Sequence, residues 1–362
     1  MRFILYILLS ALLLSCNKDN SSYDTNTEST TQTTIPTFVK GADISWVSEM
    51  EKDGKVFRMQ NGTKADIFNA LSSVGINAIR LRVWVNPQEG WSSKEDVLRL
   101  AERANKAGML LMIDFHYSDF FADPSRQTIP TAWADATTDL SKMVQYVKNH
   151  TTDVLSALKS KGITPVWVQI GNETRNGMLW PLGEIWSQNS GKMNWEYFVA
   201  MYNAGYEAAK SVFPNIIAMP HLNNAYQDNT WWFDAFKSAG GKFDMIALSH
   251  YPQAEQQMTP EQYNSQAVNN IAQLASRYKV KVMVSEVGVK SQLSESVAAS
   301  VLSSFISQIK SITQCAGVFY WEPEVYGYWK PKIYNSLGWN AYDQGAFTSD
   351  GRPSQVMNCF KE

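Results

Sequence analysis

The stretch Val168-Gln169-Ile170-Gly171-Asn172-Glu173 predicts a buried strand that ends abruptly in an Asn-Glu pair. A second stretch, Val282-Met283-Val284-Ser285-Glu286, has the same form later in the chain. Each run is apolar enough to belong to a core, and its final carboxyl group leaves that core where solvent and a substrate can reach it. A single glutamate at a strand end is more often a surface residue. The interpretation therefore depends on the pair of stretches together.

Eight short apolar runs alternate with amphipathic, helix-like segments from residue 40 onward. The candidate strands are Gly41–Trp46, Ala78–Trp84, Leu110–His116, Val166–Asn172, Ile216–Leu222, Asp244–Tyr251, Val280–Glu286 and Gly317–Trp321. The candidate helices are Ala65–Val74, Lys94–Ala107, Leu140–Lys161, Trp195–Phe213, Pro260–Tyr278 and Ser294–Ile312, which carry apolar residues at helical spacing. Gly75, Gly108 and Gly162 stand just before the next strand, as expected of left-handed helix ends.

Strict alternation of strand and helix predicts parallel strands joined by right-handed crossovers. Eight such units close into a single (β/α)8 TIM barrel of about this length. A doubly wound open sheet is the alternative architecture. It is disfavoured because no Gly-rich phosphate loop follows the first predicted strand.

The N-terminus has the pattern of a targeting segment. Residues 1–15 combine a positive start with a short apolar run, which is too short to span a bilayer permanently. Ser15-Cys16 resembles the bacterial lipoprotein signal, so we expect an exported protein anchored to the outer membrane by a lipid on Cys16. Lys18-Asp19 resembles a signal for sorting to the cell surface. Residues 16–37 then form a disordered tether and 38–362 the barrel, and an ordinary secretory signal is the alternative.

The composition of the chain indicates which classes of partner it can bind. The 362 residues carry a formal net charge of −2, without a basic stripe, which argues against nucleic acid. The 13 Trp residues suit a carbohydrate cleft, where flat rings stack on sugars, although some must be packing residues. Candidates for further sugar contacts in predicted loops are Trp133, Trp180, Trp231, Trp232 and Trp329. After Cys16, the remaining cysteines, Cys315 and Cys359, are either a disulfide or two buried thiols.

In a barrel of this kind the chemistry lies at the C-terminal ends of the strands. There Glu173 is the candidate general acid and Glu286 the candidate nucleophile, the two groups that a retaining glycosidase requires. Asn172 could bind the sugar 2-hydroxyl, Arg80 or Arg82 could keep Glu286 ionised, and one of these arginines should instead form a structural ion pair. Tyr251 is placed to donate to Glu286, and Trp321 could lie under the sugar.

No metal or cofactor is predicted. Asp114, His116 and Asp119 lie close together in sequence but lack the spacing of a zinc site, so His116 is interpreted as a hydrogen-bonding residue. Asp343 and Asp350 lie in a loop after the eighth strand without the acidic series of a calcium loop.

Five motifs together resemble the endo-β-1,4-galactanases of glycoside hydrolase family 53. They are Arg80-Leu81-Arg82-Val83-Trp84-Val85-Asn86-Pro87, Asp114-Phe115-His116-Tyr117-Ser118-Asp119, Ala122-Asp123-Pro124, Gly171-Asn172-Glu173 and Leu179-Trp180-Pro181. The resemblance implies a barrel that cleaves β-1,4-galactan and type I arabinogalactan with retention, Glu173 being the acid/base and Glu286 the nucleophile. It also implies substrate-binding residues around the cleavage site, namely Arg80, His116, Tyr117, Asp119, Asn172, Tyr251 and Trp321.

Two other functions are compatible with parts of this pattern. A mannanase, xylanase or endoglucanase of the same clan would share the catalytic pair, and only the two longer motifs argue against it. A surface glycan-binding protein on a degenerate barrel would have lost one acid, whereas both Glu173 and Glu286 are present.

Overall fold

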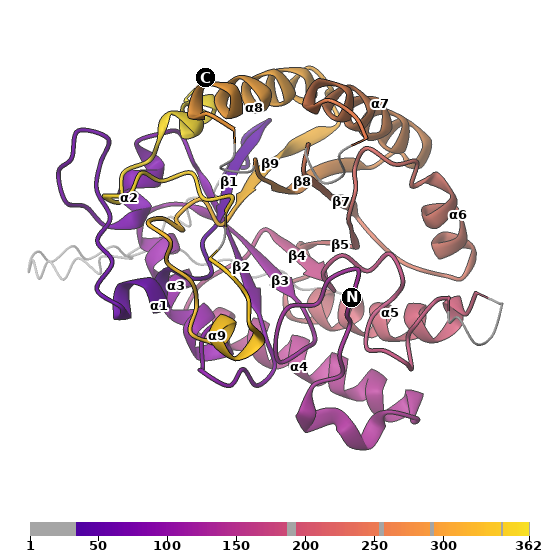
Figure 1. Ribbon diagram of the computed structural model, residues 1–362. Helices are drawn as coiled ribbons and strands as arrows, with labels where there is room; N and C mark the ends of the chain where they lie inside the picture. The colour runs from indigo at the N-terminus through magenta and orange to yellow at the C-terminus, as the bar shows by residue number, and fades with distance from the viewer. Residues whose placement is uncertain (1–33, 187–192, 253–256, 290–292, 342, 362) are drawn as a thin grey trace, which may run out of the picture. The chain divides into compact units, whose positions relative to one another are not determined.

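Parallel strands curve into a barrel around which the helices are arranged (Figure 1). The computed structural model describes residues 34–186, 193–252, 257–289, 293–341 and 343–361. The predicted signal, Cys16 and nearly all of the tether lie outside these residues. The strands in the described part are β1 Val39–Asp43, β2 Ala78–Val83, β3 Leu110–Phe115, β4 Trp167–Ile170, β5 Ile217–Met219, β6 His221–Leu222, β7 Met245–His250, β8 Lys281–Val287 and β9 Cys315–Trp321.

The predicted TIM barrel is confirmed, with one strand position divided in two. The order around the sheet is β5-β4-β3-β2-β1-β9-β8-β7-β6, so β5 and β6 stand at its two ends. They are consecutive in the chain and are separated only by Pro220, which has no N–H to donate to a ladder. The Pro220 carbonyl still accepts a hydrogen bond from Ala247 N at 3.0 Å. The nine strands of the described residues therefore occupy the eight predicted positions.

The helices lie between successive strands on the outside of the barrel. In the described residues they are α1 Val47–Lys52, α2 Ile67–Ser72, α3 Lys94–Lys106, α4 Leu140–Ser160, α5 Trp195–Val212, α6 Thr230–Ser238, α7 Pro260–Tyr278, α8 Glu295–Lys310 and α9 Ile333–Leu337, with 3-10 helices at Thr131–Ala136 and Gln355–Phe360. Side-chain caps fix several starts, since Ser93, Asp139, Thr259 and Ser294 each accept a backbone N–H of the first turn. The six predicted helices are confirmed as α2 to α5, α7 and α8.

Helix α6 was not predicted, and Trp231 and Trp232 lie on it rather than in a loop. The helix has nine residues, too few for a clear period, and it depends on the burial of Trp232, Phe233 and Phe236.

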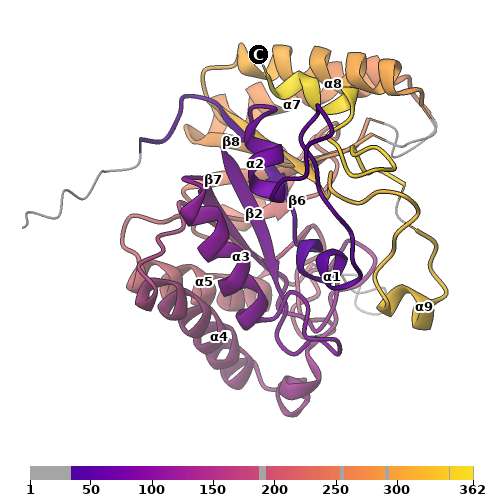
Figure 2. The ribbon, with the colours of Figure 1, turned by 90° about the vertical axis from the view of Figure 1, so that its left-hand side faces the viewer.

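In the side view of Figure 2, α1 and α9 lie at the same end of the barrel. Residues of the loop that carries α9 reach the cleft described below.

The interior of the barrel changes from apolar to polar along its axis. Residues from most of the strands fill the lower part of the interior, among them Met112, Trp167, Met283 and Phe319. Further along the same strands the inward positions become charged or polar, as at Arg80 on β2. A second, larger apolar cluster packs the outer faces of the strands against the helices. The polar layer therefore lies on a rigid apolar base.

The end of the chain returns to the N-terminal face of the barrel. Lys40 Nζ donates to the Phe360 carbonyl at 2.8 Å, and a Cβ atom at Gly75, whose φ is 96°, would lie 2.1 Å from that same oxygen. Cys315 and Cys359 are buried and are not joined to each other. The Cys359 thiol donates to the Val356 carbonyl at 3.1 Å, and burial raises the pKa of the Cys315 thiol to about 12.

No helix in the described part of the chain has the length and apolar character to cross a membrane.

Candidate active site

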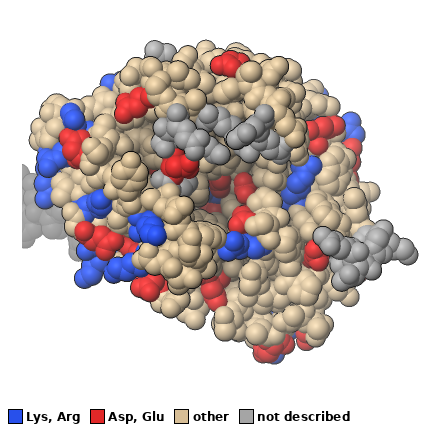
Figure 3. Space-filling model, in the orientation of Figure 1, with Lys and Arg blue, Asp and Glu red and all other residues tan. Residues whose placement is uncertain are grey.

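A cleft opens at the C-terminal ends of the strands, and acidic side chains lie inside the hollow in Figure 3. Its volume is about 260 Å³. The lining residues come from strand ends and from the loops after β3 and β9: Arg80, Arg82, His116, Phe121, Ala122, Asp123, Asn172, Glu173, Tyr251, Glu286, Trp321, Tyr334, Trp339 and Gln344. Seven of the nine sequence-predicted site residues are in this set, and Tyr117 and Asp119 are not.

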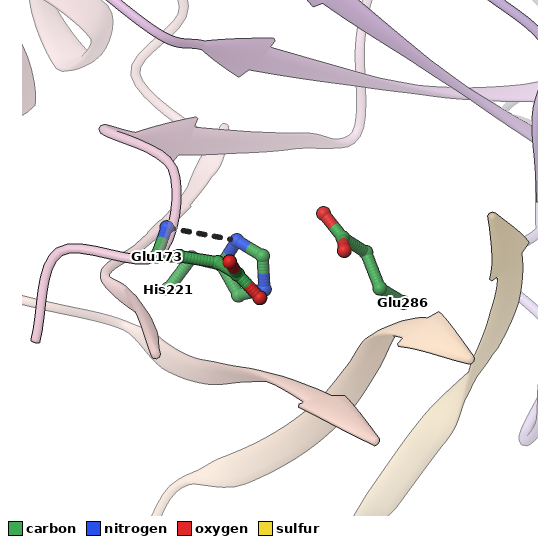
Figure 4. Close-up of side chains that lie close together, drawn as sticks. All are labelled: Glu173, His221 and Glu286. Atoms are coloured by element: carbon green, nitrogen blue, oxygen red, sulfur yellow. Dashed lines mark hydrogen bonds between the residues drawn. The ribbon is translucent and has the colours of Figure 1, made fainter. Parts of the chain in front are cut away.

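Glu173 and Glu286 face each other across this cleft (Figure 4). Three atoms lie within 4.8 Å of one another: one carboxyl oxygen of Glu173, one carboxyl oxygen of Glu286 and one ring nitrogen of His221. Glu286 belongs to β8, whereas Glu173 follows the end of β4 in a turn where its own φ is 48° and that of Gly171 is 86°. A left-handed backbone at a non-glycine residue costs about 1–2 kcal/mol. The turn holds that strain while it directs the Glu173 side chain inward.

Glu286 has a partner for each of its oxygens. Arg80 Nη2 donates to Oε1 at 2.9 Å, and the Tyr251 hydroxyl donates to Oε2 at 2.8 Å. Ser249 Oγ lies 3.3 Å from the same Oε2. Tyr251 therefore has the predicted position, as a donor to Glu286 from the neighbouring strand end.

Arg80 connects five strands at the base of the cleft. It is only 1% exposed, and its guanidinium donates to Asp43 at 2.6 Å, to Gln169 at 2.6 Å, to Asp114 at 2.8 Å and to Asn172 at 3.0 Å, in addition to Glu286. Arginine suits this position because its planar fork can satisfy several acceptors and does not lose its proton. Burial acts to raise the pKa of Asp114, but the Arg80 guanidinium and His116 hold it at about 2.

The two glutamates have different electrostatic surroundings. Burial, followed by the negative charge of Glu286, raises the pKa of Glu173 to about 8. Burial also raises the pKa of Glu286, but Arg80 and then the Tyr251 hydrogen bond oppose this. In the described residues no Lys or Arg forms a salt bridge with Glu173, so Glu173 holds the proton of the pair at neutral pH and Glu286 is ionised.

His221 is neutral because burial and Arg80 hold its pKa well below the usual range. Its Nδ1 lies 2.8 Å from Asn172 Oδ1, which already accepts from Arg80, so Nδ1 carries the ring proton and donates. Its Nε2 therefore accepts a hydrogen bond from Ser249 Oγ at 2.8 Å. His221 thus ties the turn that carries Glu173 to the strand that carries Ser249.

His116 and Trp321 complete the walls of the cleft. His116 Nε2 donates to Asp114 at 2.9 Å, and Nδ1 accepts the Ala122 N–H at 3.0 Å, so both ring nitrogens bind protein groups and hold the loop after β3. Trp321 ends β9 and makes edge contacts with Tyr251, 6.2 Å between ring centroids, and with Phe121, at 6.3 Å.

Two residues that the sequence assigned to substrate binding lie outside the cleft. The Tyr117 side chain is buried behind the barrel wall, where its hydroxyl lies 2.7 Å from Thr151 Oγ1 on α4. Asp119 joins two loops, accepting the backbone N–H of Asn86 at 3.0 Å and of Thr131 at 2.8 Å. Both assignments are therefore corrected to structural roles.

Arg82 forms the structural ion pair that was predicted for one of the two arginines. Its guanidinium pairs with the buried Glu322 and lies 4.1 Å from the centroid of the Trp46 ring and 4.7 Å from that of Phe121. The pair closes the floor of the cleft beside Trp321.

The sequence did not assign roles to Gln169, Ser249 and His221, which orient the groups around Glu286. A signal for them exists in the sequence, because each is a polar residue in a largely apolar strand, and in the structure each is less than 2% exposed. Tyr334 and Trp339 gave no such signal, since they come from the long loop after β9.

The geometry favours an acid pair over a metal site. Glu173, His221 and Glu286 are the one group of three possible metal ligands found close together in the described residues. The Arg80 guanidinium already donates to an electron pair of Glu286 Oε1, and His221 Nδ1 carries the proton that it donates to Asn172, so neither atom is free to bind a metal.

Comparisons of the sequence and of the structure with known proteins both find glycosyl hydrolases. The family model described as glycosyl hydrolase family 53 matches residues 39–360. An arabinogalactan endo-beta-1,4-galactanase of Thermothelomyces thermophilus is 29% identical over 343 residues, 89% of this chain and 98% of the relative. An uncharacterized protein of Niallia circulans is 36% identical over 218 residues, 59% of either chain. The structure of the Ignisphaera aggregans GH53 catalytic domain superposes with a TM-score of 0.77 and 28% identity, over 90% of this chain and 96% of that one.

Proposed function

The chain belongs to glycosyl hydrolase family 53, and from this premise we propose that it is a retaining endo-β-1,4-galactanase that acts on galactan and type I arabinogalactan. The observation that carries the proposal is the carboxyl pair. Glu173 and Glu286 oxygens lie within 4.8 Å, closer than the roughly 6.5–9.5 Å that leaves room for the water of an inverting enzyme.

In the first step Glu286 Oε attacks the anomeric carbon while Glu173 gives its proton to the departing glycosidic oxygen. The carbon–oxygen bond breaks, the leaving chain departs as an alcohol and a glycosyl ester remains on Glu286. Arg80 and Tyr251 keep the nucleophile ionised and in place before the attack. Asn172 lines the cleft beside Glu173, where its remaining amide proton can reach a sugar hydroxyl.

In the second step Glu173, now ionised, removes a proton from water. The resulting hydroxide attacks the same carbon from the face that the leaving chain vacated, and Glu286 leaves as a carboxylate. Two inversions restore the original configuration at the anomeric carbon.

Two observations support galactan as the substrate. The Thermothelomyces thermophilus relative, named for action on arabinogalactan, is similar along nearly its whole length. The residues of the two longer motifs also build this cleft, because Arg80, Arg82, Asp114 and His116 form its base and wall.

The direct test compares β-1,4-galactan with mannan and xylan as substrates for the purified protein. We expect galactan to be cleaved to shorter oligosaccharides, proton NMR to detect the β anomer first, and Glu286→Gln to abolish turnover while galactan binding persists. Preferential hydrolysis of mannan or xylan would refute the substrate, and initial release of the α anomer would refute the mechanism.

We also propose that the protein is exported and anchored to the outer membrane through a lipid on Cys16, facing the cell surface. The support is the short apolar run that ends in Ser15-Cys16, followed by a polar tether. Cys16→Ala should move the protein from the membrane fraction to the soluble one with unchanged activity, and retention in the membrane fraction would refute the anchor.

A further inference from the structure

Helix α6 presents an exposed tryptophan beside a fully buried one. Trp231 is 36% exposed, whereas its neighbour Trp232 has no exposed surface and packs on Phe198 and Phe236. Because the two residues are adjacent at the start of a helix, Trp232 anchors α6 while Trp231 faces outward. Tryptophan is enriched at binding interfaces, where a partner can cover its large, mostly apolar ring.

The start of α6 is fixed to the turn that carries Glu173. Trp232 Nε1 donates to the Arg175 carbonyl at 2.9 Å, and Arg175 Nη1 donates to Asn229 Oδ1 at 2.5 Å. Arg175 stands only two residues after Glu173. The position of Trp231 relative to Glu173 is therefore set by hydrogen bonds rather than by a free loop.

Arg175 and Trp186 lie against Trp231. The Arg175 guanidinium is 5.4 Å from the centroid of the Trp231 ring, and the Trp186 ring is 6.0 Å away at an angle of 47°. Arg175 forms no salt bridge with a described acidic residue, although burial lowers its pKa somewhat. Two aromatic rings and a cation without a carboxylate partner thus occur together on the rim of the barrel.

Hydrogen bonds tie α6 to Arg175, two residues after Glu173, so this group adjoins the Glu173 side of the cleft. Glu173 gives its proton to the leaving oxygen, so the leaving part of the substrate passes over the end of β4 and away from Glu286 on β8. Arg175 and Trp186 belong to the loop after β4, and Trp231 to the helix that follows β6. In Figure 1, α6 stands on the side of the barrel away from β1 and α9.

We propose that Arg175, Trp186 and Trp231 form a binding surface for the leaving-group part of a β-1,4-galactan chain. The proposal rests on the proposed galactanase function. Galactose units have apolar C–H faces that stack on flat aromatic rings, and their hydroxyls accept hydrogen bonds from a guanidinium, which has five N–H donors. A surface of this kind would favour long substrates and cleavage within the chain.

The experiment compares two substrates that differ beyond the cleavage point. Galactan reaches the surface, whereas p-nitrophenyl β-1,4-galactobioside has a leaving group that ends next to Glu173. For Trp231→Ala we expect kcat/KM on galactan to fall about tenfold, equivalent to about 1.4 kcal/mol, and kcat/KM on the aryl substrate to change less than about twofold. Trp231→Phe should keep most of the galactan activity, and Val297→Ala, at a comparably exposed apolar residue on α8, should keep all of it.

An unchanged kcat/KM on galactan, or an equal loss on both substrates, would overturn the proposal. Failure of the proposed function would look different, because wild-type protein would then not cleave galactan at all. Trp231 is exposed, so its replacement should leave the fold intact, and equal thermal midpoints for the three variants and wild type check this point.

Discussion

Replacing Tyr251 by Phe tests how the protein keeps its nucleophile ionised. The Tyr251 hydroxyl donates to Glu286 Oε2 at 2.8 Å, and burial together with Glu286 raises the pKa of this hydroxyl well above its usual range. Tyr251 is therefore a donor at every working pH. Tyr251→Phe removes this donor and leaves Arg80 as the donor to Glu286, because the Ser249 hydroxyl donates to His221 Nε2.

The size of the effect follows from the charge on the acceptor. A hydrogen bond to a charged group contributes about 1.5–3 kcal/mol. Since about 1.36 kcal/mol corresponds to one pKa unit, losing the bond should raise the pKa of Glu286 by about 1–2 units. The acid limb of kcat/KM, which reports the first deprotonation of the carboxyl pair, should move up by the same amount.

The assay is the pH dependence of kcat/KM on galactan for wild type, Tyr251→Phe and Tyr117→Phe. Tyr117→Phe is a matched control, because it removes a buried hydroxyl that lies 2.7 Å from Thr151, outside the cleft. We expect the acid limb to move only in Tyr251→Phe. An acid limb that stays in place or moves to lower pH in that variant would refute the assignment of Glu286 as the ionised nucleophile supported by Tyr251.

Three further outcomes can be measured. Wild-type kcat/KM should fall as pH rises through about 8, because ionised Glu173 cannot protonate the leaving group, and a flat profile to pH 10 would contradict this. Burial raises the pKa of Glu324, whose two side-chain oxygens have no hydrogen-bond partner among the described residues. The folded state therefore binds this proton more tightly than the unfolded chain, and stability should fall as pH rises above about 4.5. The thermal midpoint of Glu324→Gln should therefore drop less between pH 5 and pH 8, and an equal drop would exclude Glu324 as the cause. In a Cys16→Ala background, thiol titration in denaturant without reductant should find both Cys315 and Cys359 reactive, whereas a bridge would hide two thiols.

The sequence predicted the barrel and most of the cleft because strand ends in this fold share one rim. Tyr117 shows how alternation along a strand could have refined the result. On β3, Met112 and Asp114 point into the barrel, Phe115 points out, and the same alternation continues past the strand to place His116 inside and Tyr117 outside.

Other parts of the site could not be predicted from a single sequence. The carboxyl group of Asp119 binds two backbone groups on loops whose path depends on the whole rim. Tyr334 and Trp339 reach the cleft from a loop without a periodic pattern. Contacts of this kind depend on tertiary packing, which local spacing does not encode.

The charge count in the cleft explains how one glutamate serves as acid and then as base. The Arg80 guanidinium contacts three carboxylates, Asp43, Asp114 and Glu286, so this region is already negative before Glu173 is considered. A further negative charge at Glu173 is unfavourable, and its proton is retained until the leaving oxygen takes it. Once Glu286 is esterified by the sugar, its charge disappears, and with it the second-largest cause of the raised pKa of Glu173. The pKa of Glu173 then falls toward its ordinary value, and the ionised carboxylate is ready to activate water in the second step.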